Sequence, residues 1–385
     1  MADTRPSIGS LPPSGVAGGD AGAAAPLAAA FDWLVPFVSV VMPVRNEGDF
    51  MTRSLGAVLT QTYPADRYEV IVADGMSTDG TRARLATLAH AHACLRVIDN
   101  PGRIVSTGLN AALAQVRGDV VIRVDGHCEI AEDYIERCVA HLREPGVQIA
   151  GGPLTTLGET PTAQAIAVAM SSPFGVGNSA FRTGQLGAFV DTVAFPAYPR
   201  QLLREAGPFD EELVRNQDDE YNYRLRKMGA RILLAPDVRS RYYSRSSFRS
   251  LWRQYFQYGY WKVRVLQKHA RQMRPRQFVP PLFLAGLGAL ALLALAVPVA
   301  RGALAAAEVA YLTANVSAAT ITARREGGHY FLPLCVAFAT LHFSYGAGFL
   351  YGLVRFSGRW GDRATRASAA PVGAPSHDPA PKARG

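Results

Sequence analysis

The chain has 385 residues, of which 49% are hydrophobic and 18% charged, and its formal net charge is +9. This length allows one large α/β domain and a further region. The four cysteines include no CxxC pair, which argues against a disulfide framework or a cysteine-rich zinc site. No zinc-finger, basic-zipper or RNA-binding signature is present, so we expect no nucleic-acid partner.

The first 36 residues are rich in Ala, Gly and Pro, and they lack both a basic segment and a sustained apolar core. This composition is typical of a disordered leader rather than of a signal peptide.

Residues 37–246 alternate short apolar runs with helical patterns. The expected strands are 37–42, 69–73, 95–98 and 119–124, and helices are expected near 50–60, 79–90, 106–116 and 131–143. Strands that alternate with helices of this length predict an α/β fold with a mostly parallel central sheet. The rhythm is lost over 151–199, where we expect irregular, substrate-facing structure, and helices resume near 199–205 and 219–227.

The C-terminal part predicts membrane association. Residues 247–277 place aromatic and basic side chains at helical spacing, which favours an amphipathic helix on a bilayer surface. The region 278–355 contains uncharged runs at 279–300 and 331–354, each long enough to span a bilayer. The apolar stretch 302–323 holds Glu308 and either crosses as well or lies in the interface; we favour three crossings over two. The tail, residues 356–385, is predicted to be disordered.

Basic residues flank these apolar runs, in 239–276 and 355–366. A positive charge there suits a membrane surface or phosphorylated substrates. We therefore expect a multi-pass protein of the cell membrane whose catalytic domain is cytoplasmic.

Polar clusters follow three of the expected strands: 43–47, 74–75 and 125–127. Ligands of parallel sheets bind at the carboxyl ends of the strands, so these clusters are expected to meet. An aspartate such as Asp79 has the alternative role of capping a helix. No glycine-rich phosphate loop follows the first strand. A divalent cation held by Asp125 and His127 would bridge two phosphates instead.

Four motifs in order resemble family 2 glycosyltransferases with the GT-A fold: SVVMPVRNE at 39–47, VADG at 72–75 with STD at 77–79, VDGH at 124–127, and NQDDE at 216–220. Within that family the chain looks most similar to the ExoA-like succinoglycan biosynthesis glycosyltransferases. The segment LHFSYGAGF at 341–349 is similar to that subgroup too. The resemblance covers about residues 37–354.

The resemblance implies a binding site for a nucleotide sugar, most simply a UDP-sugar, with Asp74 accepting from the base. The residues expected to contact this donor are Pro43, Arg45, Glu47, Asp74, Gly75, Arg103 and Asp125, although Arg103 is equally compatible with a surface role. Asp125 and His127 are the expected metal ligands, and the alternative for His127 is an ordinary hydrogen-bonded histidine. The histidine stands where most of the family has an acidic residue, which favours Mn²⁺ over Mg²⁺.

Asp218 aligns with the general base of the family, and Asp219 would take this role if the register shifts by one residue. The alternative is an acidic start of a solvated helix. On the acceptor side, the resemblance suggests Asp191, Gln257 and Trp261, and the aromatic residues of 257–261 are equally compatible with a place in the membrane interface. Residues 257–261 (QYGYW) lack the second arginine of the motif found in processive relatives, which argues against a processive synthase.

These expectations combine into an inverting glycosyltransferase that moves a sugar from a nucleoside diphosphate to a membrane-bound, polyprenyl-linked acceptor in polysaccharide biosynthesis. Two alternatives remain at this point. A nucleotidyltransferase would need a glycine-rich basic loop after the first strand, which is absent. A catalytically silent scaffold that binds nucleotide sugars would not need Asp125 and Asp218.

Overall fold

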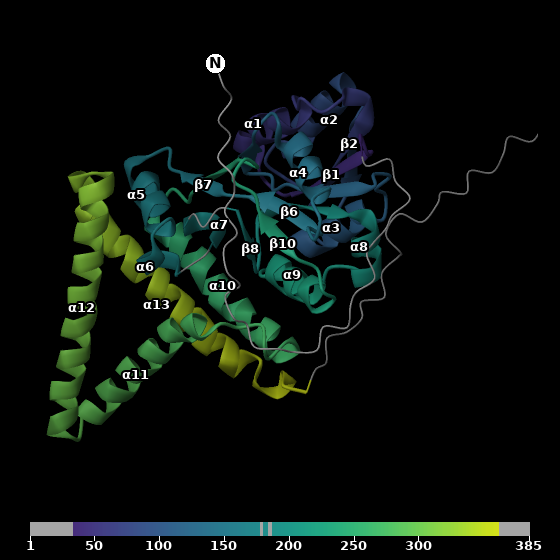
Figure 1. Ribbon diagram of the computed structural model, residues 1–385. Coiled ribbons are helices and arrows are strands. Elements are labelled where there is room, and N and C mark those ends of the chain that lie inside the picture. Colours follow the sequence, from purple (N-terminus) through teal and green to yellow (C-terminus); the bar gives the residue numbers. More distant parts are fainter. Residues whose placement is uncertain (1–33, 178–179, 184–186, 362–385) are drawn as a thin grey trace, which may run out of the picture. The chain divides into compact units, whose positions relative to one another are not determined.

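The computed structural model describes residues 34–177, 180–183 and 187–361 (Figure 1). Most of the predicted leader and most of the predicted tail lie outside these residues. The strands are β1 (Val38–Val44), β2 (Tyr68–Asp74), β3 (Leu95–Asp99), β4 (Val120–Arg123), β5 (Cys128–Ile130), β6 (Ile149–Gly152), β7 (Leu154–Leu157), β8 (Ala188–Val190), β9 (Ala194–Pro199), β10 (Ile232–Leu234) and β11 (Ser240–Tyr243).

Eight strands form the central sheet in the order β3-β2-β1-β4-β9-β6-β10-β8. The pairs of β1 with β2, β1 with β4, β2 with β3, and β6 with β10 are parallel, whereas β9 and β8 run antiparallel to their neighbours. The prediction of an α/β fold with a mostly parallel sheet is confirmed. The strands β5, β11 and β7 form a second, small sheet.

Helices cover both faces of the central sheet. They are α1 (Gly48–Leu59), α2 (Thr81–Ala91), α3 (Val105–Leu113), α4 (Tyr134–Leu142), α8 (Arg200–Ala206) and α9 (Gln217–Lys227). The short helices α5 (Pro161–Met170), α6 (Pro173–Val176) and α7 (Ala180–Thr183) lie instead near β7 or the C-terminal helices. Successive side chains of a strand point to opposite faces. Val40 and Met42 of β1 therefore pack in one core with α1 and α4, whereas Val41 packs in the other with α3.

The expectation of irregular structure over 151–199 is wrong. The segment includes β7, β8, β9 and the helices α5 to α7, and β9 lies between β4 and β6 inside the sheet. Proline is rare in central strands because it cannot donate to the ladder, and this pattern concealed β9. Pro196 is accommodated because the pairing of β6 with β9 is irregular there, between Ala150 and Gly152.

The C-terminal part consists of α10 (Phe248–Lys268), α11 (Val279–Ala294), α12 (Pro298–Glu326) and α13 (Phe331–Arg355). Helices α10 and α13 pack together through glycines on both sides. A Cβ atom at Gly259 would lie 2.1 Å from the carbonyl oxygen of Tyr345, and one at Gly348 would lie 2.0 Å from that of Phe256. Any larger residue at these positions would separate the two backbones.

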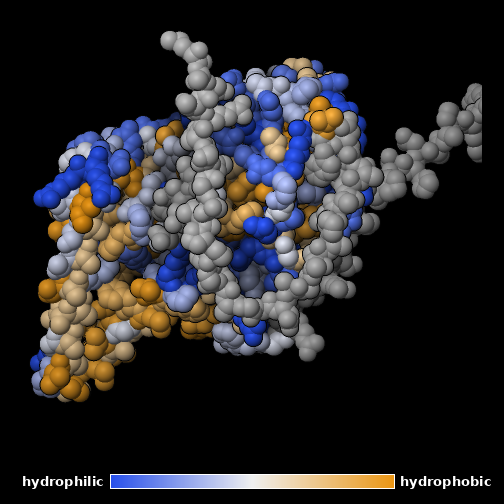
Figure 2. Space-filling view, in the orientation of Figure 1, coloured by the Kyte–Doolittle hydropathy of each residue, from blue (hydrophilic) through white to orange (hydrophobic). Residues whose placement is uncertain are grey.

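Three stretches, Pro275–Ala294, Pro298–Glu326 and Gly328–Arg355, are helical, long and apolar enough to cross a membrane. Helices α11 and α12 expose large apolar side chains such as Leu282, Leu292 and Val299, and Figure 2 shows the hydrophobic surface over these two helices. Helix α11 stops at Ala294 and α12 starts at Pro298, since proline is favoured in the first turn of a helix and disfavoured later.

Ion pairs hold α10 against the α/β domain. The guanidinium of Arg264, which is fully buried, donates to both carboxylate oxygens of Glu212 at 2.8 and 3.0 Å, and Lys268 Nζ lies 2.7 Å from Glu212 Oε2. Burial disfavours the charged carboxylate, but these hydrogen bonds outweigh it and lower the pKa of Glu212 to about 2. Whether α10 lies along a bilayer surface, as its sequence suggests, stays a prediction.

Candidate active site

A cavity of about 1020 Å³ lies at the carboxyl ends of β1 and β4. Its walls come from the loops after these strands, from the start of α9, and from α10 to α13. In the sheet, β2 and β3 lie on one side of β1, and the chain then returns to place β4 on the other side. This is the switch point at which open α/β sheets bind ligands.

Of the predicted site residues, nine line the cavity: Pro43, Arg45, Glu47, Arg103, Asp125, His127, Asp191, Asp218 and Asp219. The strand-end clusters 43–47 and 125–127 therefore meet the acidic start of α9, as expected from a mostly parallel sheet.

A buried arginine connects the two main aspartates of the cavity. Arg123, at the end of β4, donates from Nη2 to Asp125 Oδ1 at 2.8 Å, and its Nη1 lies 3.5 Å from Asp218 Oδ2. Burial alone would lower the pKa of this guanidinium, but Asp125 and Asp218 outweigh the burial and raise it. Arg123 thus stays charged and holds the carboxylate that follows β4 and the carboxylate of α9 next to one cation.

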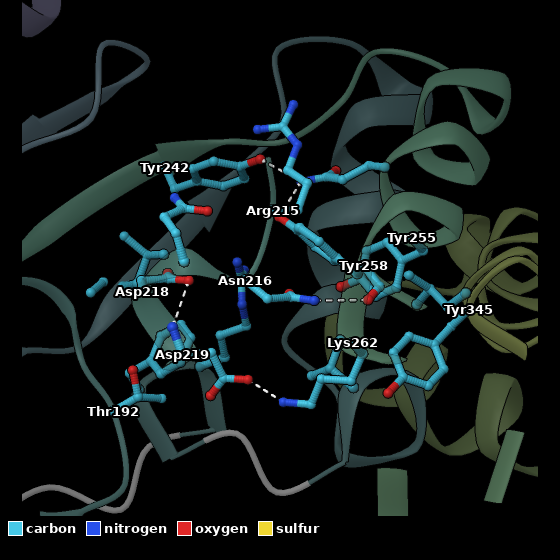
Figure 3. Close-up of a pocket in the computed structure, with 18 of the residues that line it drawn as sticks. Thr192, Arg215, Asn216, Asp218, Asp219, Tyr242, Tyr255, Tyr258, Lys262 and Tyr345 are labelled. Atoms are coloured by element: carbon cyan, nitrogen blue, oxygen red, sulfur yellow. Dashed lines mark hydrogen bonds and ion pairs between the residues drawn. The ribbon is translucent and has the colours of Figure 1, made fainter. Parts of the chain in front are cut away.

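Asp218 and Asp219 are neighbours in sequence but differ in their partners (Figure 3). The side chain of Asp219 forms an ion pair with Nζ of Lys262 on α10, which is itself buried. Asp218 Oδ1 accepts the backbone N–H of Asp219 at 2.9 Å, and its side chain is 47% exposed. Asp218 therefore presents the more accessible carboxylate, whereas that of Asp219 is neutralised.

Two residues of the cavity could hold a cation. His127 Nδ1 lies 2.9 Å from Glu47 Oε1, which leaves Nε2 for a ligand and fixes the ring as carboxylate partners do in metal sites. The two oxygens of Asp125 retain lone pairs beyond the bonds from Arg123. Within the described residues, no group of three His, Cys, Asp or Glu side chains could form a metal site. These two residues fit a cation that completes its coordination with phosphate oxygens and water.

Asp74 and Gly75 do not line the cavity. The Asp74 side chain is fully buried, accepts the N–H of Ser77 at 3.2 Å and pairs with Arg82 at 3.2 Å. Gly75 lies against Arg45, because a Cβ atom there would come within 3.0 Å of Arg45 Cβ. The contact of Asp74 with a base stays a prediction, and its present bonds orient the loop that supports Arg45.

Asp79 caps the start of α2, as considered from the sequence, since its Oδ1 accepts the backbone N–H of Thr81 at 3.1 Å, and it also contacts α1. Its Oδ2 accepts the N–H of Gly48, at the start of α1, at 3.1 Å, and its Oδ1 accepts the hydroxyl of Thr81 at 2.6 Å. The hydrogen bond from Thr81 is the main cause that lowers the pKa of Asp79. Asp79 therefore joins the loops that follow β1 and β2.

The residues suggested for the acceptor divide into two groups. Asp191 lies in the cavity wall, paired with Arg226 at 2.5 Å and with Arg274. Gln257 and Trp261 hydrogen-bond to each other at 3.1 Å and do not line the cavity; the Trp261 ring lies near Phe356. Their contact with an acceptor stays a prediction without support from this geometry.

Helix α10 instead presents another face to the cavity, which includes Gln254, Tyr258 and Lys262. These residues lie one turn apart and so share a face. The sequence reasoning missed them, and it missed Arg123 as well. A signal for Arg123 was available: a charged residue interrupts the apolar run of β4 two positions before Asp125.

The part of the cavity among the C-terminal helices is mostly apolar and aromatic, with His342 of α13 as a polar exception. Phe174 of α6, Phe283 of α11, Tyr311 of α12 and Leu341 of α13 line it. The cavity therefore extends from charged groups at the sheet to aromatic and aliphatic groups on helices that can span a membrane.

Comparisons with known proteins show the family of the chain. The family model Glycosyl transferase family 2 matches residues 39–205. The succinoglycan biosynthesis protein ExoA of Rhizobium meliloti is 32% identical over 243 residues, which cover 63% of this chain and 73% of that protein.

Another similar protein is the dolichyl N-acetyl-alpha-D-glucosaminyl phosphate 3-beta-D-2,3-diacetamido-2,3-dideoxy-beta-D-glucuronosyltransferase of Methanococcus voltae. It is 28% identical over 240 residues, or 60% of this chain and 74% of that protein. Among solved structures, the mannosyltransferase PcManGT of Pyrobaculum calidifontis, in complex with GDP-Man and Mn²⁺, has a TM-score of 0.53 and 23% identity over 82% of this chain and 87% of that one. This structure shares the fold.

Proposed function

Because the chain belongs to family 2 of the glycosyltransferases, we propose that it transfers one sugar, with inversion, from a nucleoside diphosphate to a polyprenyl-linked acceptor in the membrane. The observation that carries this proposal is the accessible carboxylate of Asp218 in the same cavity as Asp125, with Arg123 between them. A catalytically silent scaffold that only binds nucleotide sugars would not require Asp218 to stay accessible while the neighbouring Asp219 is neutralised.

In the proposed reaction Asp218 accepts the proton of an acceptor hydroxyl. The hydroxyl oxygen attacks the anomeric carbon from the side opposite the nucleotide, and the bond from that carbon to the diphosphate breaks with its electron pair on the diphosphate. One displacement on the opposite face inverts the configuration, as in inverting glycosidases. Asp219 remains paired with Lys262 and takes no proton.

The donor is proposed to bind at the sheet end of the cavity, where Arg45 and Arg103 can pair with its diphosphate. A divalent cation at Asp125 and His127 would neutralise charge on the departing diphosphate. The histidine ligand favours Mn²⁺ over Mg²⁺. The expectation of uracil as the base rests on the resemblance alone, and a comparison of UDP-sugars with GDP-sugars tests it.

The acceptor is proposed to enter from the bilayer. Support comes from the aromatic and aliphatic end of the cavity among α11, α12 and α13. The names of two similar proteins refer to succinoglycan biosynthesis and to a dolichyl-linked phosphate. Since nucleotide sugars are made in the cytoplasm, we place the α/β domain on that side of the cell membrane and assign the chain to exopolysaccharide assembly.

Incubation of membranes that contain the chain with a panel of labelled nucleotide sugars, followed by lipid extraction, tests the proposal. Label should enter the lipid fraction with one donor and should be lost with Asp218→Asn. If no donor labels the lipid fraction, while the purified protein still binds nucleotide sugars, the transfer to a lipid-linked acceptor is refuted.

A further inference from the structure

Unpaired polar atoms are concentrated around one cavity. In the part of the chain that the structure describes, eight buried side-chain nitrogen or oxygen atoms lack a hydrogen-bonding partner within the protein. Five of them belong to residues that line the cavity: Gln217, Arg226, Gln254, Gln272 and Tyr345. Because each such group costs about 1–3 kcal/mol when it is left unsatisfied, their convergence on one cavity indicates a polar ligand.

The ligand must both donate and accept hydrogen bonds. Gln217 and Gln254 present unpaired carbonyl oxygens, which need donors, and the unpaired group of Tyr345 is a hydroxyl, which can act in either role. The carboxamide nitrogen of Gln254 donates to the hydroxyls of Tyr242 at 3.2 Å and Tyr258 at 2.9 Å. Each tyrosine hydroxyl that accepts this bond keeps its own proton to donate. A phosphate group, which at neutral pH mainly accepts, would leave the glutamine oxygens unsatisfied.

Aromatic rings accompany these polar atoms. Tyr255 and Tyr258 of α10 line the cavity with their ring centroids 5.3 Å apart, and Tyr242 of β11 lines it as well. A saccharide has both features that this region requires. Its hydroxyl groups donate and accept hydrogen bonds, and the C–H face of its ring packs on aromatic side chains. Two cations border this region: the guanidinium of Arg182 lies 5.5 Å from the centroid of the Tyr242 ring, and Lys262 is paired with Asp219.

This region is attached to the segment that carries the proposed base. Asn216 Nδ2 donates to the carbonyl oxygen of Tyr258 at 2.9 Å, and Lys262 pairs with Asp219. In Figure 3, Tyr345 extends from the C-terminal helices toward Lys262. A sugar bound against α10 and α13 would therefore lie beside the start of α9, where Asp218 is located.

We propose that Gln254, Tyr258 and Tyr345 form a saccharide subsite, which binds the hydroxyl groups of a sugar that the acceptor already carries. This inference rests on the proposed function. It assigns recognition of the acceptor sugar in part to α13, a helix that can span the membrane. A reaction that attaches a first sugar to the lipid phosphate must then precede this one.

Tyr345→Phe tests the subsite because it removes only the unpaired hydroxyl. The substitution should raise the KM for a sugar-bearing acceptor by about 2- to 10-fold, which corresponds to one hydrogen bond, and should leave the KM for the nucleotide sugar unchanged. Since the hydroxyl has no partner in the free protein, the melting temperature should stay constant or rise. Tyr351→Phe, on an exposed part of the same helix, is the matched control and should change neither constant.

The acceptor probes are a synthetic polyprenyl diphosphate that carries one hexose and the same lipid phosphate without a sugar, each supplied to the full chain in phospholipid membranes. Transfer to the sugar-bearing lipid alone supports the subsite. Equal transfer to both lipids, or an unchanged acceptor KM in Tyr345→Phe, overturns the subsite and leaves the proposed function intact. A lack of transfer to either lipid with every donor refutes the proposed function itself.

Discussion

The two adjacent aspartates of α9 should respond to the same substitution in opposite ways. Asp218→Asn replaces an accessible carboxylate by an amide that can still accept the N–H of Asp219, so the local geometry is preserved. If Asp218 is the base, kcat should fall by about 10²- to 10⁴-fold, which is about 2.7–5.5 kcal/mol of activation free energy. Donor binding and the melting temperature should change little.

Asp219→Asn removes the carboxylate that neutralises Lys262, a lysine that is 2% exposed. A buried cation without its partner destabilises the fold, and because Asp219 is itself 31% exposed, the cost should be about 1–3 kcal/mol rather than that of a fully buried pair. The variant should therefore melt at a lower temperature, with kcat reduced far less than in Asp218→Asn.

The assay combines single-turnover transfer from the labelled donor, donor binding by calorimetry, and thermal melting, all on the full chain in the same detergent. Glu211→Gln, a nearby acidic residue outside the cavity, is the control for a simple loss of negative charge. An inactive Asp219→Asn together with an active Asp218→Asn would refute the assignment and transfer the base to Asp219.

Three further predictions concern the metal, the docking of α10 and the topology. Excess chelator should abolish transfer and Mn²⁺ should restore it, whereas Asp125→Ala should stay nearly inactive with added Mn²⁺; full activity in chelator would exclude the metal. The pKa of Glu212 is lowered from 4.5 to about 2, so the stability that it contributes is present above about pH 4.5 and is lost as the pH falls toward 2. The difference in melting temperature between the wild type and Glu212→Gln should therefore shrink from about pH 6 to about pH 3, and a constant difference would show that these ion pairs do not stabilise the fold. A reporter fused after Arg366 should lie outside the cell if the three helices that can span a membrane all cross it, and inside if only two do. A reporter near Arg271 should be cytoplasmic in both cases, and an external one would contradict the mechanism.

The sequence was sufficient to predict the part of the site that depends on strand ends. Clusters 43–47 and 125–127 come together because parallel strands end at one edge of a sheet, a rule that needs no tertiary information. Asp74 also lies at the end of a parallel strand, but its side chain does not line the cavity. Its carboxylate instead accepts the N–H of Ser77 and pairs with Arg82. Position at a strand end predicts the edge on which a residue lies, and local partners then decide whether its side chain reaches the ligand.

The acceptor side could not be predicted in the same way, because a helix has several faces. Gln257 and Trp261 were chosen from a motif, but the cavity lies on the face of Gln254, Tyr258 and Lys262. Helix α13 decides which face points inward, because it packs against Gly259 through Tyr345, a residue more than eighty positions further along the chain. No pattern within α10 contains this information.

The contacts of α10 and α13 give the C-terminal helices a part in the proposed chemistry beyond anchoring. Lys262 distinguishes Asp219 from Asp218, so the accessible carboxylate depends on a residue that follows the α/β domain. Tyr258 and Tyr345 belong to the same two helices, and glycine contacts keep these helices at a fixed distance. In the proposed mechanism, an acceptor that stays in the bilayer reaches Asp218 past these residues. In this proposal the α/β domain carries the donor side of the site, and the acceptor side forms where the C-terminal helices pack against it.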